Sequence, residues 1–364
     1  MGFSCGIVGL PNVGKSTLFN ALTSTRQAEA ANYPFCTIEP NKAIVNVPDI
    51  RIEVLAKIAA SQKIIPTQIE FVDIAGLVKG ASKGEGLGNQ FLATIRETDA
   101  IIHVLRCFQD DNITHVEGSV DPLRDVEIIN TELMLADLES IEKRLPQLEK
   151  KLASGKKEHA IEVDLLKKAQ ALLAEGKFVS NVKDVDLIEL KKLNLITSKP
   201  VLYVCNVGEE DAASGNQYSE KVAQYASING ALLVVISSKI EEEIALLEGA
   251  DEKKEFLEAI GLAETGLAKI IATGYQILGL LTFFTIGPKE AHAWTVKKGA
   301  KAPQAAGEIH TDFEKGFIRA EVISYEDYVK FSGESGAKDN GKMRLEGKDY
   351  TTQDGDIMHF RFNL

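Results

Sequence analysis

Gly9-Leu10-Pro11-Asn12-Val13-Gly14-Lys15-Ser16 fits the pattern G-x-x-x-x-G-K-[ST] of loops that bind nucleotide phosphates. Residues 3–8, before it, form an apolar run that predicts a buried strand, and residues 17–22, after it, begin an amphipathic helix. In such a unit, successive backbone N–H groups point at one phosphate group, and the positive end of the helix dipole lies behind them. The stretch therefore predicts a nucleotide-phosphate site. The residues of this stretch that we expect to contact the nucleotide are Asn12, Val13, Gly14, Lys15, Ser16 and Thr17.

Two side chains of this loop have specific expected roles. Lys15 is expected to reach the β- and γ-phosphates and to act in catalysis, and the Ser16 hydroxyl can ligate Mg²⁺. The alternative is a glycine-containing turn that merely joins a strand to a helix. The strand, the Lys-Ser pair and the helix occur in register, which favours the phosphate site.

The size and composition of the chain limit its class. Its 364 residues suggest two or three domains. Hydrophobic residues make up 45% and charged residues 26%, as in an ordinary soluble protein with a sizeable core. The formal net charge is −12, so DNA is not an expected partner and any contact with RNA must come from a local patch.

The cysteines and the N-terminus indicate the compartment. Cys5, Cys36, Cys107 and Cys205 are widely scattered, without a C-x-x-C pair, which favours reduced thiols and no structural zinc. The chain has no charged-then-apolar signal sequence, and its longest apolar run, 277–286, is too short to span a bilayer. We expect a cytoplasmic protein, without a membrane partner and monomeric.

Strand and helix signals alternate in the first third of the chain. Alternation of this kind implies a mostly parallel sheet with helices on both faces. Sheet-type sequence returns later, so the segment between is expected to be an insertion. The expected strands are 43–47, 68–74, 100–107, 201–205 and 231–236, and the expected helices are 49–60, capped by Asp49, and 89–98.

The inserted segment has a helical pattern. Five of its apolar residues recur at spacings of three and four, as in a coiled-coil seam. A second helix is expected at 158–175, which makes an antiparallel arm, although two ordinary helices packed on the sheet would give the same short pattern. Pro146 lies within the seam and is expected to kink or end the first helix. The five residues are Leu138, Ile141, Leu145, Leu148 and Leu152.

Beyond the second group of strands, three helices precede a different kind of sequence. From residue 278, short strands separated by glycine-rich turns indicate a compact α+β module of about 85 residues. The expected helices are 239–247, 251–260 and 264–274, and the expected strands are 281–287, 291–296, 317–324 and 356–362. A local basic face is expected from Lys297, Lys298, Lys301, Lys315 and Arg319. The predicted domains are 1–120 and 198–277 for the nucleotide domain, 121–197 for the arm, and 278–364 for the C-terminal domain.

Two further motifs complete the expected metal site. Asp73-Ile74-Ala75-Gly76 follows a predicted strand, where an acidic residue holds Mg²⁺ through a water and the Gly76 N–H can meet the γ-phosphate. Thr37 lies in the loop after the first helix, where a hydroxyl can close over the metal, although Thr23 and Thr25 are also available. The expected metal-site residues are Ser16, Thr37 and Asp73.

Asn206-Val207-Gly208-Glu209 follows another predicted strand, at the place where small GTPases carry Asn-Lys-x-Asp. In those proteins the Asp carboxylate accepts from the N1–H and the 2-amino group of guanine, and adenine offers neither donor. Here the carboxylate belongs to Glu209, one methylene longer, and Val207 replaces the lysine that braces the base. We expect Asn206, Val207 and Glu209 to frame the base with weakened guanine selectivity. A loop glutamate without base contact is the alternative.

Leu77 stands where Ras-like enzymes carry the glutamine that orients the attacking water. A leucine can neither donate nor accept a hydrogen bond, so another residue must position the water. His115, in the polar loop 110–118, is one catalytic candidate, and a solvated surface histidine is the alternative.

Several stretches together resemble one family. Gly76-Leu77-Val78-Lys79-Gly80-Ala81, with GEGLGNQFL at 84–92, looks like the glycine-rich switch of the Obg superfamily. The Asn-x-x-Glu motif at 206–209 narrows the resemblance to the YchF group, the Obg-like ATPases. The stretch 299–319, GAKAPQAAGEIHTDFEKGFIR, is similar to the TGS module of that group.

This resemblance covers the whole chain in order. It implies an α/β P-loop nucleotide domain, an inserted coiled-coil arm and a β-grasp TGS domain, and an ATPase that prefers ATP to GTP and associates with ribosomes. In the group, Leu replaces the catalytic Gln, as at Leu77, and the metal-binding Ser and Thr correspond to Ser16 and Thr37. Its K⁺-associated asparagine corresponds to Asn12.

We therefore expect a slow ATP-hydrolysing switch that uses Mg²⁺, with K⁺ as a second candidate cation. Its arm and TGS domain are expected to bind a ribosome, at the large subunit, or an RNA. A GTPase of the same fold is an alternative if Glu209 still reaches guanine. A non-enzymatic adaptor locked by nucleotide is another alternative because of Leu77, and a thiol-responsive regulator is a third because Cys36 adjoins Thr37.

Overall fold

A six-stranded sheet organises the first part and the middle of the chain. The computed structural model describes residues 3–30, 41–74, 87–110, 112–113, 115–182, 187–247 and 249–363. Cys36, Thr37, Gly76 and Leu77, on which expectations rest, lie outside the described residues. The chain divides into two compact units, Met1–Val45 with Glu70–Gly274, and Asn46–Ile69 with Tyr275–Leu364.

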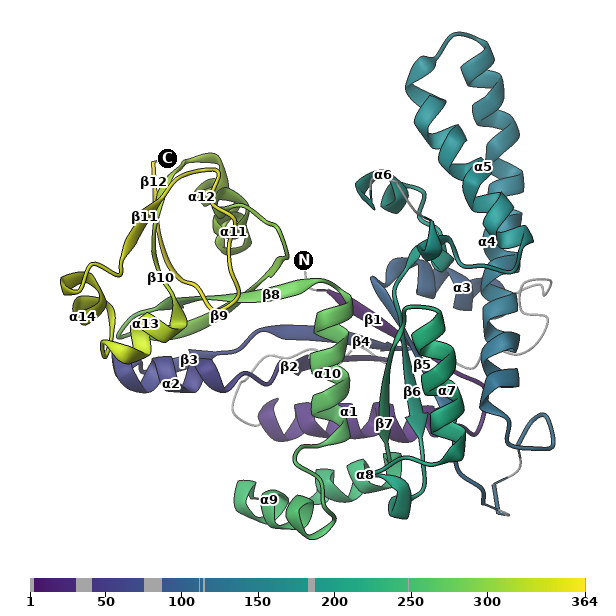
Figure 1. Cartoon of the computed structure of the whole chain (residues 1–364), viewed down its shortest axis with the longest axis horizontal. Helices are drawn as coiled ribbons and strands as arrows, with labels where there is room; N and C mark the ends of the chain where they lie inside the picture. Colours follow the sequence, from purple (N-terminus) through teal and green to yellow (C-terminus); the bar gives the residue numbers. More distant parts are fainter. Residues whose placement is uncertain are drawn as a thin grey trace. The chain divides into compact units, whose positions relative to one another are not determined.

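The sheet of the first unit has the order β2-β4-β1-β5-β6-β7 (Figure 1). The pairings of β1 with β4 and β5, of β5 with β6, and of β6 with β7 are parallel, which confirms the predicted parallel sheet. Every residue of β5 is buried, as in a central parallel strand covered on both faces. The strands are β1 (Ser4–Val8), β2 (Lys42–Asn46), β4 (Gln68–Asp73), β5 (Ala100–Arg106), β6 (Val201–Asn206) and β7 (Leu232–Ile236).

Helices cover this sheet. Val126 of α4 (Pro122–Ala153) and Val222 of α7 pack on Leu105 and Tyr203, so these two helices share one face of the sheet. The helix α1 lies against α8. The helices are α1 (Lys15–Ala30), α3 (Leu87–Glu97), α7 (Gln217–Ile228), α8 (Ser238–Leu246), α9 (Ala250–Ala259) and α10 (Gly266–Ile277). Within the described residues, no helix is long and apolar enough to cross a membrane. Cys5, Cys107 and Cys205 are buried free thiols.

The inserted arm is a hairpin of α4 (Pro122–Ala153) and α5 (Ala160–Ala174), followed by α6 (Leu187–Lys192) (Figure 1). Ile141, Leu145 and Leu148 of the predicted seam are buried against α5, with Leu138 and Leu152 partly buried beside them. The expectation that Pro146 ends the helix is wrong, because α4 continues through it. Pro146 is exposed, so water can meet the one carbonyl that loses its helical N–H partner.

A buried carboxylate anchors the base of the arm. Asp137 of α4 accepts from the backbone N–H groups of Ile196 and Thr197 at 3.0 and 2.8 Å and from the Thr197 hydroxyl at 2.8 Å. The guanidinium of Arg96 lies 3.1 Å from the same carboxylate. These bonds fix the middle of α4 to the chain that enters β6.

The sheet of the second unit has the order β11-β10-β12-β8-β9-β3, with α11 packed on one face. Four of its strands match the predicted ones. Residues 46–69 belong to this unit, whereas the sequence analysis assigned them to the nucleotide domain. They include α2 (Ile50–Ala59) and β3 (Lys63–Ile65). Asp49 caps α2, as predicted. The strands are β8 (Leu280–Ile286), β9 (Glu290–Lys297), β10 (Phe317–Ile323), β11 (Arg344–Glu346) and β12 (Ile357–Phe362). The helices are α11 (Ala302–Ile309), α12 (Thr311–Lys315), α13 (Tyr325–Lys330) and α14 (Glu334–Asp339).

Candidate functional site

The loop between β1 and α1 turns sharply at two residues. Asn12 has a φ of 63° and Gly14 a φ of 94°, both in the left-handed region that most side chains disfavour. A Cβ at Gly14 would lie 2.1 Å from the side-chain nitrogen of Asn206, so only glycine fits there. The turn brings Lys15 to the first position of α1, whose free N–H groups and positive dipole end face the loop.

Lys15 is held in place by an acidic partner. Its ammonium group forms an ion pair with the carboxylate of Asp73, at the end of the neighbouring strand β4. The two side chains are 9% and 17% exposed, so water screens the pair only weakly. Ser16, the next residue, is exposed. The predicted metal-site residues Ser16 and Asp73 line the same cavity as Lys15.

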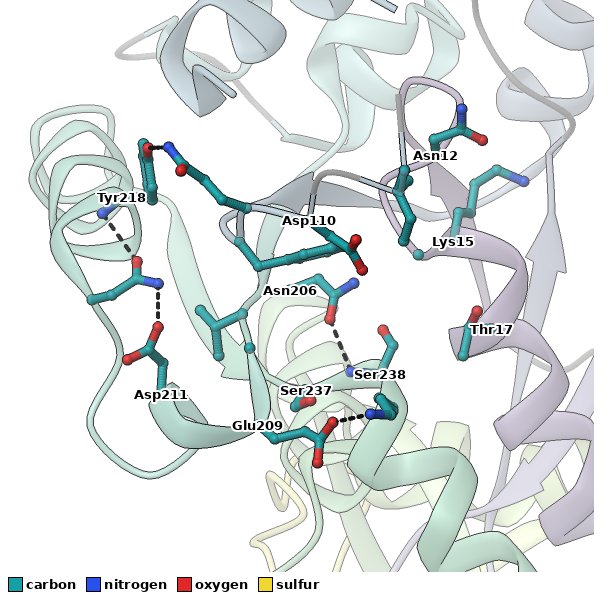
Figure 2. A pocket seen from close by; sticks show the side chains of 18 of the residues that line it. Asn12, Lys15, Thr17, Asp110, Asn206, Glu209, Asp211, Tyr218, Ser237 and Ser238 are labelled. Carbon is teal, nitrogen blue, oxygen red and sulfur yellow. Dashed lines mark hydrogen bonds and ion pairs between the residues drawn. The ribbon is translucent and has the colours of Figure 1, made fainter. Parts of the chain in front are cut away.

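Asn206 joins the loop to the far side of the sheet. Its side-chain N–H donates to the carbonyl oxygen of Val13 at 2.9 Å. Its side-chain oxygen accepts from the backbone N–H of Ser238 at 2.8 Å (Figure 2). The residue is 4% exposed. Asn206 therefore serves as a structural tie between three loops.

These loops surround a cavity of about 1170 Å³. The phosphate loop, with Asn12 and Lys15, forms one wall, and the segments that follow β5, β6 and β7 form the others (Figure 2). Asp73 also lines the cavity. In parallel sheets, ligands bind at this carboxyl edge of the strands. The residues that line the cavity are those at 10–12, 14–17, 73, 108–110, 113, 206–211, 216–218, 237–239 and 242.

The end of the cavity remote from Lys15 holds the predicted base-framing residues. Glu209 forms an ion pair with Lys239 across the cavity rim, where both side chains are exposed (Figure 2). Val207 is only 3% exposed and packs in the core under the loop. The Ser238 hydroxyl is buried and has no hydrogen-bond partner among the described residues.

A buried arginine shapes the loop after β5. The guanidinium of Arg106 donates to the carbonyl oxygens of Ile113, Phe108 and Asp110 at 2.8, 3.2 and 3.2 Å. Nearby, the side chain of Asn216 donates to the Cys107 carbonyl oxygen at 2.8 Å and caps α7. These bonds hold the wall formed by residues 108–110 in a fixed shape.

His115 lies in the same loop and is buried. Its Nε2 lies 2.9 Å from the Asp125 carboxylate, and its Nδ1 accepts from the Glu117 N–H at 3.1 Å. With Nδ1 as the acceptor, Nε2 carries the proton and donates to Asp125. Among the described residues, His115 is not part of the cavity lining, so the structure brings it to Asp125 and not to Lys15.

Local sequence patterns alone do not reveal a role for Ser237, Ser238 and Lys239, or for Arg106. The three residues follow a predicted strand directly, and their position at the carboxyl end of a parallel strand is the signal that could have found them. Arg106 ends a run of apolar residues, and only the fold reveals that it is buried. Thr37 and Gly76 lie outside the described residues.

Comparison with known proteins identifies relatives of the whole chain. A family model described as "50S ribosome-binding GTPase" matches residues 4–134, and the YchF-GTPase C-terminal model, described as "Protein of unknown function (DUF933)", matches 280–363. The proteins called "Ribosome-binding ATPase YchF" from Haemophilus influenzae and Bacillus subtilis are 56% and 53% identical over 100% of both chains.

A solved structure agrees with these matches. The Schizosaccharomyces pombe protein titled "YchF GTPase" is 40% identical and superposes with a TM-score of 0.86, covering 99% of this chain and 98% of that one. Its match spans the sheet, the arm and the C-terminal unit. The resemblance predicted from the sequence is therefore confirmed, and the chain belongs to the YchF family.

Proposed function

We propose that this protein binds ATP in the cavity beside Lys15, hydrolyses it slowly, and uses the change of nucleotide state as a switch on the ribosome. The observation that carries the proposal is the phosphate loop, which opens into a cavity framed by the ends of β5, β6 and β7. Relatives 53–56% identical over their whole length are called ribosome-binding ATPases. The cavity offers phosphate contacts at one end and a separate place for a base at the other.

A magnesium ion fits the donors beside Lys15. The Ser16 hydroxyl and the Asp73 carboxylate are hard oxygen donors at one end of the cavity. The described residues contain no group of three or more His, Cys, Asp or Glu that could hold a metal alone. This agrees with Mg²⁺, which proteins usually hold through one or two side chains together with the phosphates of the substrate. Ser16 would hold the ion directly and Asp73 would hold it through a water molecule, with Thr37 as a third proposed ligand. A magnesium ion bound there would offset the negative charge of the phosphates.

The base end favours adenine over guanine. The Glu209 carboxylate is paired with Lys239 at the exposed rim of the cavity. Val207 is buried in the core and takes the place of the lysine that would brace a guanine base. The Ser238 N–H is already used by Asn206 and is not free to donate to the O6 of guanine. Each absent donor or acceptor costs guanine recognition about 1–3 kcal/mol.

Lys15 and the loop amides position the phosphates and stabilise the charge that develops in hydrolysis. His115 stays our candidate for positioning water. It shares the 107–121 loop with the cavity-lining residues Phe108 and Asp110, so a rearrangement of that loop on nucleotide binding would be needed to free it from Asp125. Asn12 is exposed in the phosphate loop and is the proposed contact for K⁺.

The second candidate is a GTPase of the same fold. It is favoured because the family that matches residues 4–134 is described as a GTPase family and the fission-yeast relative is called a GTPase. The "50S" of the family description also supports the large ribosomal subunit as the docking partner.

One experiment separates the two candidates. Dissociation constants for ATP and GTP, measured by calorimetry in the same Mg²⁺ and K⁺ buffer, should favour ATP. Hydrolysis should be measured with and without purified ribosomes, and co-sedimentation should show whether nucleotide changes ribosome binding. A strong preference for GTP would replace the ATPase with the GTPase.

A further inference from the structure

The sheet of the second unit opens between its two central strands. β8 and β12 are parallel neighbours, yet they pair at a single position, Ile357 opposite Phe284. The Gly355 N–H, just before β12, also donates to the Thr282 carbonyl oxygen of β8 at 2.8 Å. Beyond Phe284 and Ile357, within the described residues 249–363, no further register pair joins the two strands. The outer pairings continue: β8 stays paired with β9 to Ile286, and β12 with β10 from Ile357 to Phe362. Figure 1 shows β8 and β12 running apart.

Backbone groups of both strands face this opening. The Phe284 N–H donates to the Asp356 carbonyl oxygen at 2.8 Å, which fixes which residues of each strand point toward the other. Because direction alternates along a strand, the backbone groups of Ile286 on β8 and of Met358 and Phe360 on β12 point into the opening. Inside the sheet, β8 and β12 therefore each present a strand edge whose backbone hydrogen-bonding groups are only partly paired with the other strand.

Apolar side chains line the opening and make it a groove of about 700 Å³. One wall carries the single tryptophan of the chain, Trp294, whose indole N–H donates to the Thr285 hydroxyl at 2.9 Å. Another carries Phe313, stacked on Phe362 with ring centroids 3.8 Å apart. Groove-lining aromatic groups of this kind accept bulky apolar side chains of a partner.

The rim of the groove is acidic. Its lining includes the carboxylates of Glu290, Glu321 and Glu334 against one lysine, Lys289. Glu321 is paired with Arg361 at 3.2 Å, so Glu290 and Glu334 carry the excess negative charge. The formal charge of the whole chain is −12. Phosphate-bearing partners such as RNA are therefore repelled at this groove, and cationic partners are attracted.

An exposed apolar residue extends the surface beside the rim. Leu345 of β11 is 62% exposed and lies opposite Glu321 in the antiparallel pairing of β10 with β11. The side chains of paired residues share one face of a sheet. An apolar contact therefore adjoins the acidic rim.

We propose that this groove binds an extended, basic and apolar segment of a partner protein, which adds to the open strand edges. The backbone of the segment would bond with Ile286, Met358 or Phe360, alternate apolar side chains would enter between Trp294 and Phe313, and the lysines or arginines between them would meet Glu290 and Glu334. The inference stands on the second unit alone and does not depend on the nucleotide site.

Peptide binding to the full chain tests the proposal. The probe is the acetylated, amidated heptapeptide KIKFKVK, and its controls are KSKSKSK, EIEFEVE and a short oligouridylate. Binding is followed by calorimetry and by the fluorescence of Trp294, which reports directly from the groove wall. We expect KIKFKVK to bind and shift the fluorescence, and we expect the three controls to bind at least about tenfold more weakly.

Charge reversal at the rim locates the site. Glu290→Lys with Glu334→Lys should weaken KIKFKVK binding about tenfold or more. Glu255→Lys with Glu264→Lys changes two exposed carboxylates of the other unit by the same charge and should leave binding unchanged. ATP hydrolysis should be the same in all these proteins.

The proposal is overturned by any of four results. KSKSKSK could bind as tightly as KIKFKVK, which would mean general attraction to an acidic protein. Both pairs of reversals could weaken binding equally, which would place the peptide elsewhere. The oligouridylate could bind with a Trp294 shift, or no peptide could bind at all, and the groove would then be no site for a basic strand.

Discussion

The side-chain N–H of Asn206 donates to the carbonyl oxygen of Val13 at 2.9 Å, across 193 positions of sequence. The same side chain accepts from Ser238, so one buried amide connects the phosphate loop with the segments at the base end of the cavity. The phosphate and base ends of the proposed nucleotide site are therefore held at a fixed separation before a ligand arrives.

Asn206→Ala should weaken ATP binding and destabilise the fold. The change leaves the Val13 carbonyl and the Ser238 N–H buried without partners, at about 1–3 kcal/mol each. Calorimetry with ATP should show a loss of about tenfold or more in affinity, and urea unfolding should show the lower stability. Asn206→Asp keeps the acceptor for Ser238 and places an oxygen against Val13, so it should be at least as harmful. Unchanged ATP affinity in both variants would contradict the role of this tie.

Lys15→Ala should abolish ATP hydrolysis while the protein stays folded. Lys15 is the side-chain cation of the phosphate loop, and its loss removes charge stabilisation from the phosphates. Circular dichroism should be unchanged, and a phosphate-release assay should show no turnover above background. Lys143→Ala, which removes an exposed lysine of the arm, is the matched control. Normal turnover in folded Lys15→Ala protein would refute the phosphate site.

Lys239→Ala should shift nucleotide preference toward GTP. Without its partner, the Glu209 carboxylate is free to accept from the N1–H and 2-amino groups of guanine. A gain of about 1–3 kcal/mol for GTP would change the ratio of the two dissociation constants by about tenfold or more. Glu209→Gln in the same background should remove the gain. A constant ratio would mean that Glu209 does not read the base.

His103 should make the protein less stable in mild acid. It is 1% exposed in the middle of β5, its Nε2 has no partner among the described residues, and burial lowers its pKa to about 3. An unfolded imidazole has a pKa near 6.5, so only the unfolded chain takes up a proton between these values. The contribution is present above pH 6.5 and is lost as pH falls, by about 2 kcal/mol at pH 5. Urea unfolding of His103→Leu should have a flatter pH profile than wild type by that amount, and His359→Gln, at an exposed histidine, should not. Parallel profiles for His103→Leu and wild type would contradict this.

His115→Ala should lower the rate of ATP hydrolysis more than it lowers ATP affinity, if the loop frees His115 in the nucleotide-bound state. Single-turnover hydrolysis and calorimetry measure the two separately. Asp125→Asn, which loosens the same contact from the other side, should not lower the rate as much. If both variants lose stability and keep their rates, His115 is only a structural residue of the loop.

The sequence predicted those parts of the fold that depend on local patterns. The apolar strands β1, β5 and β6 and the cap of α2 by Asp49 are local features, and the structure has them where expected. The helix α7 was missed because its apolar signal is weak, with only Val222 and Ala226 among its buried hydrophobic residues. β3 was missed because its partner is β9, far away in the chain, and no local pattern records such a pairing.

The same distinction holds for the candidate site. The phosphate loop has a fixed spacing, so its residues could be named in advance. The ion pair of Glu209 with Lys239 and the burial of His115 beside Asp125 depend on how separate segments meet. Residue type alone therefore suggested a catalytic His115, whereas the fold shows that a loop movement must come first.

The anchor at Asp137 gives the long helix α4 a point about which it can tilt. The 32-residue helix starts next to the loop that borders the nucleotide cavity. At Asp137 it is held by hydrogen bonds from the backbone N–H groups of Ile196 and Thr197. From Asp137 to the end of α4 at Ala153 the helix rises about 24 Å. A tilt of about 5° at Asp137 would carry the end of α4 about 2 Å. The start of α4, about 22 Å away on the other side of Asp137, would move by a similar distance in the opposite direction, so the helix passes a displacement beside the cavity to the tip of the arm at nearly full size.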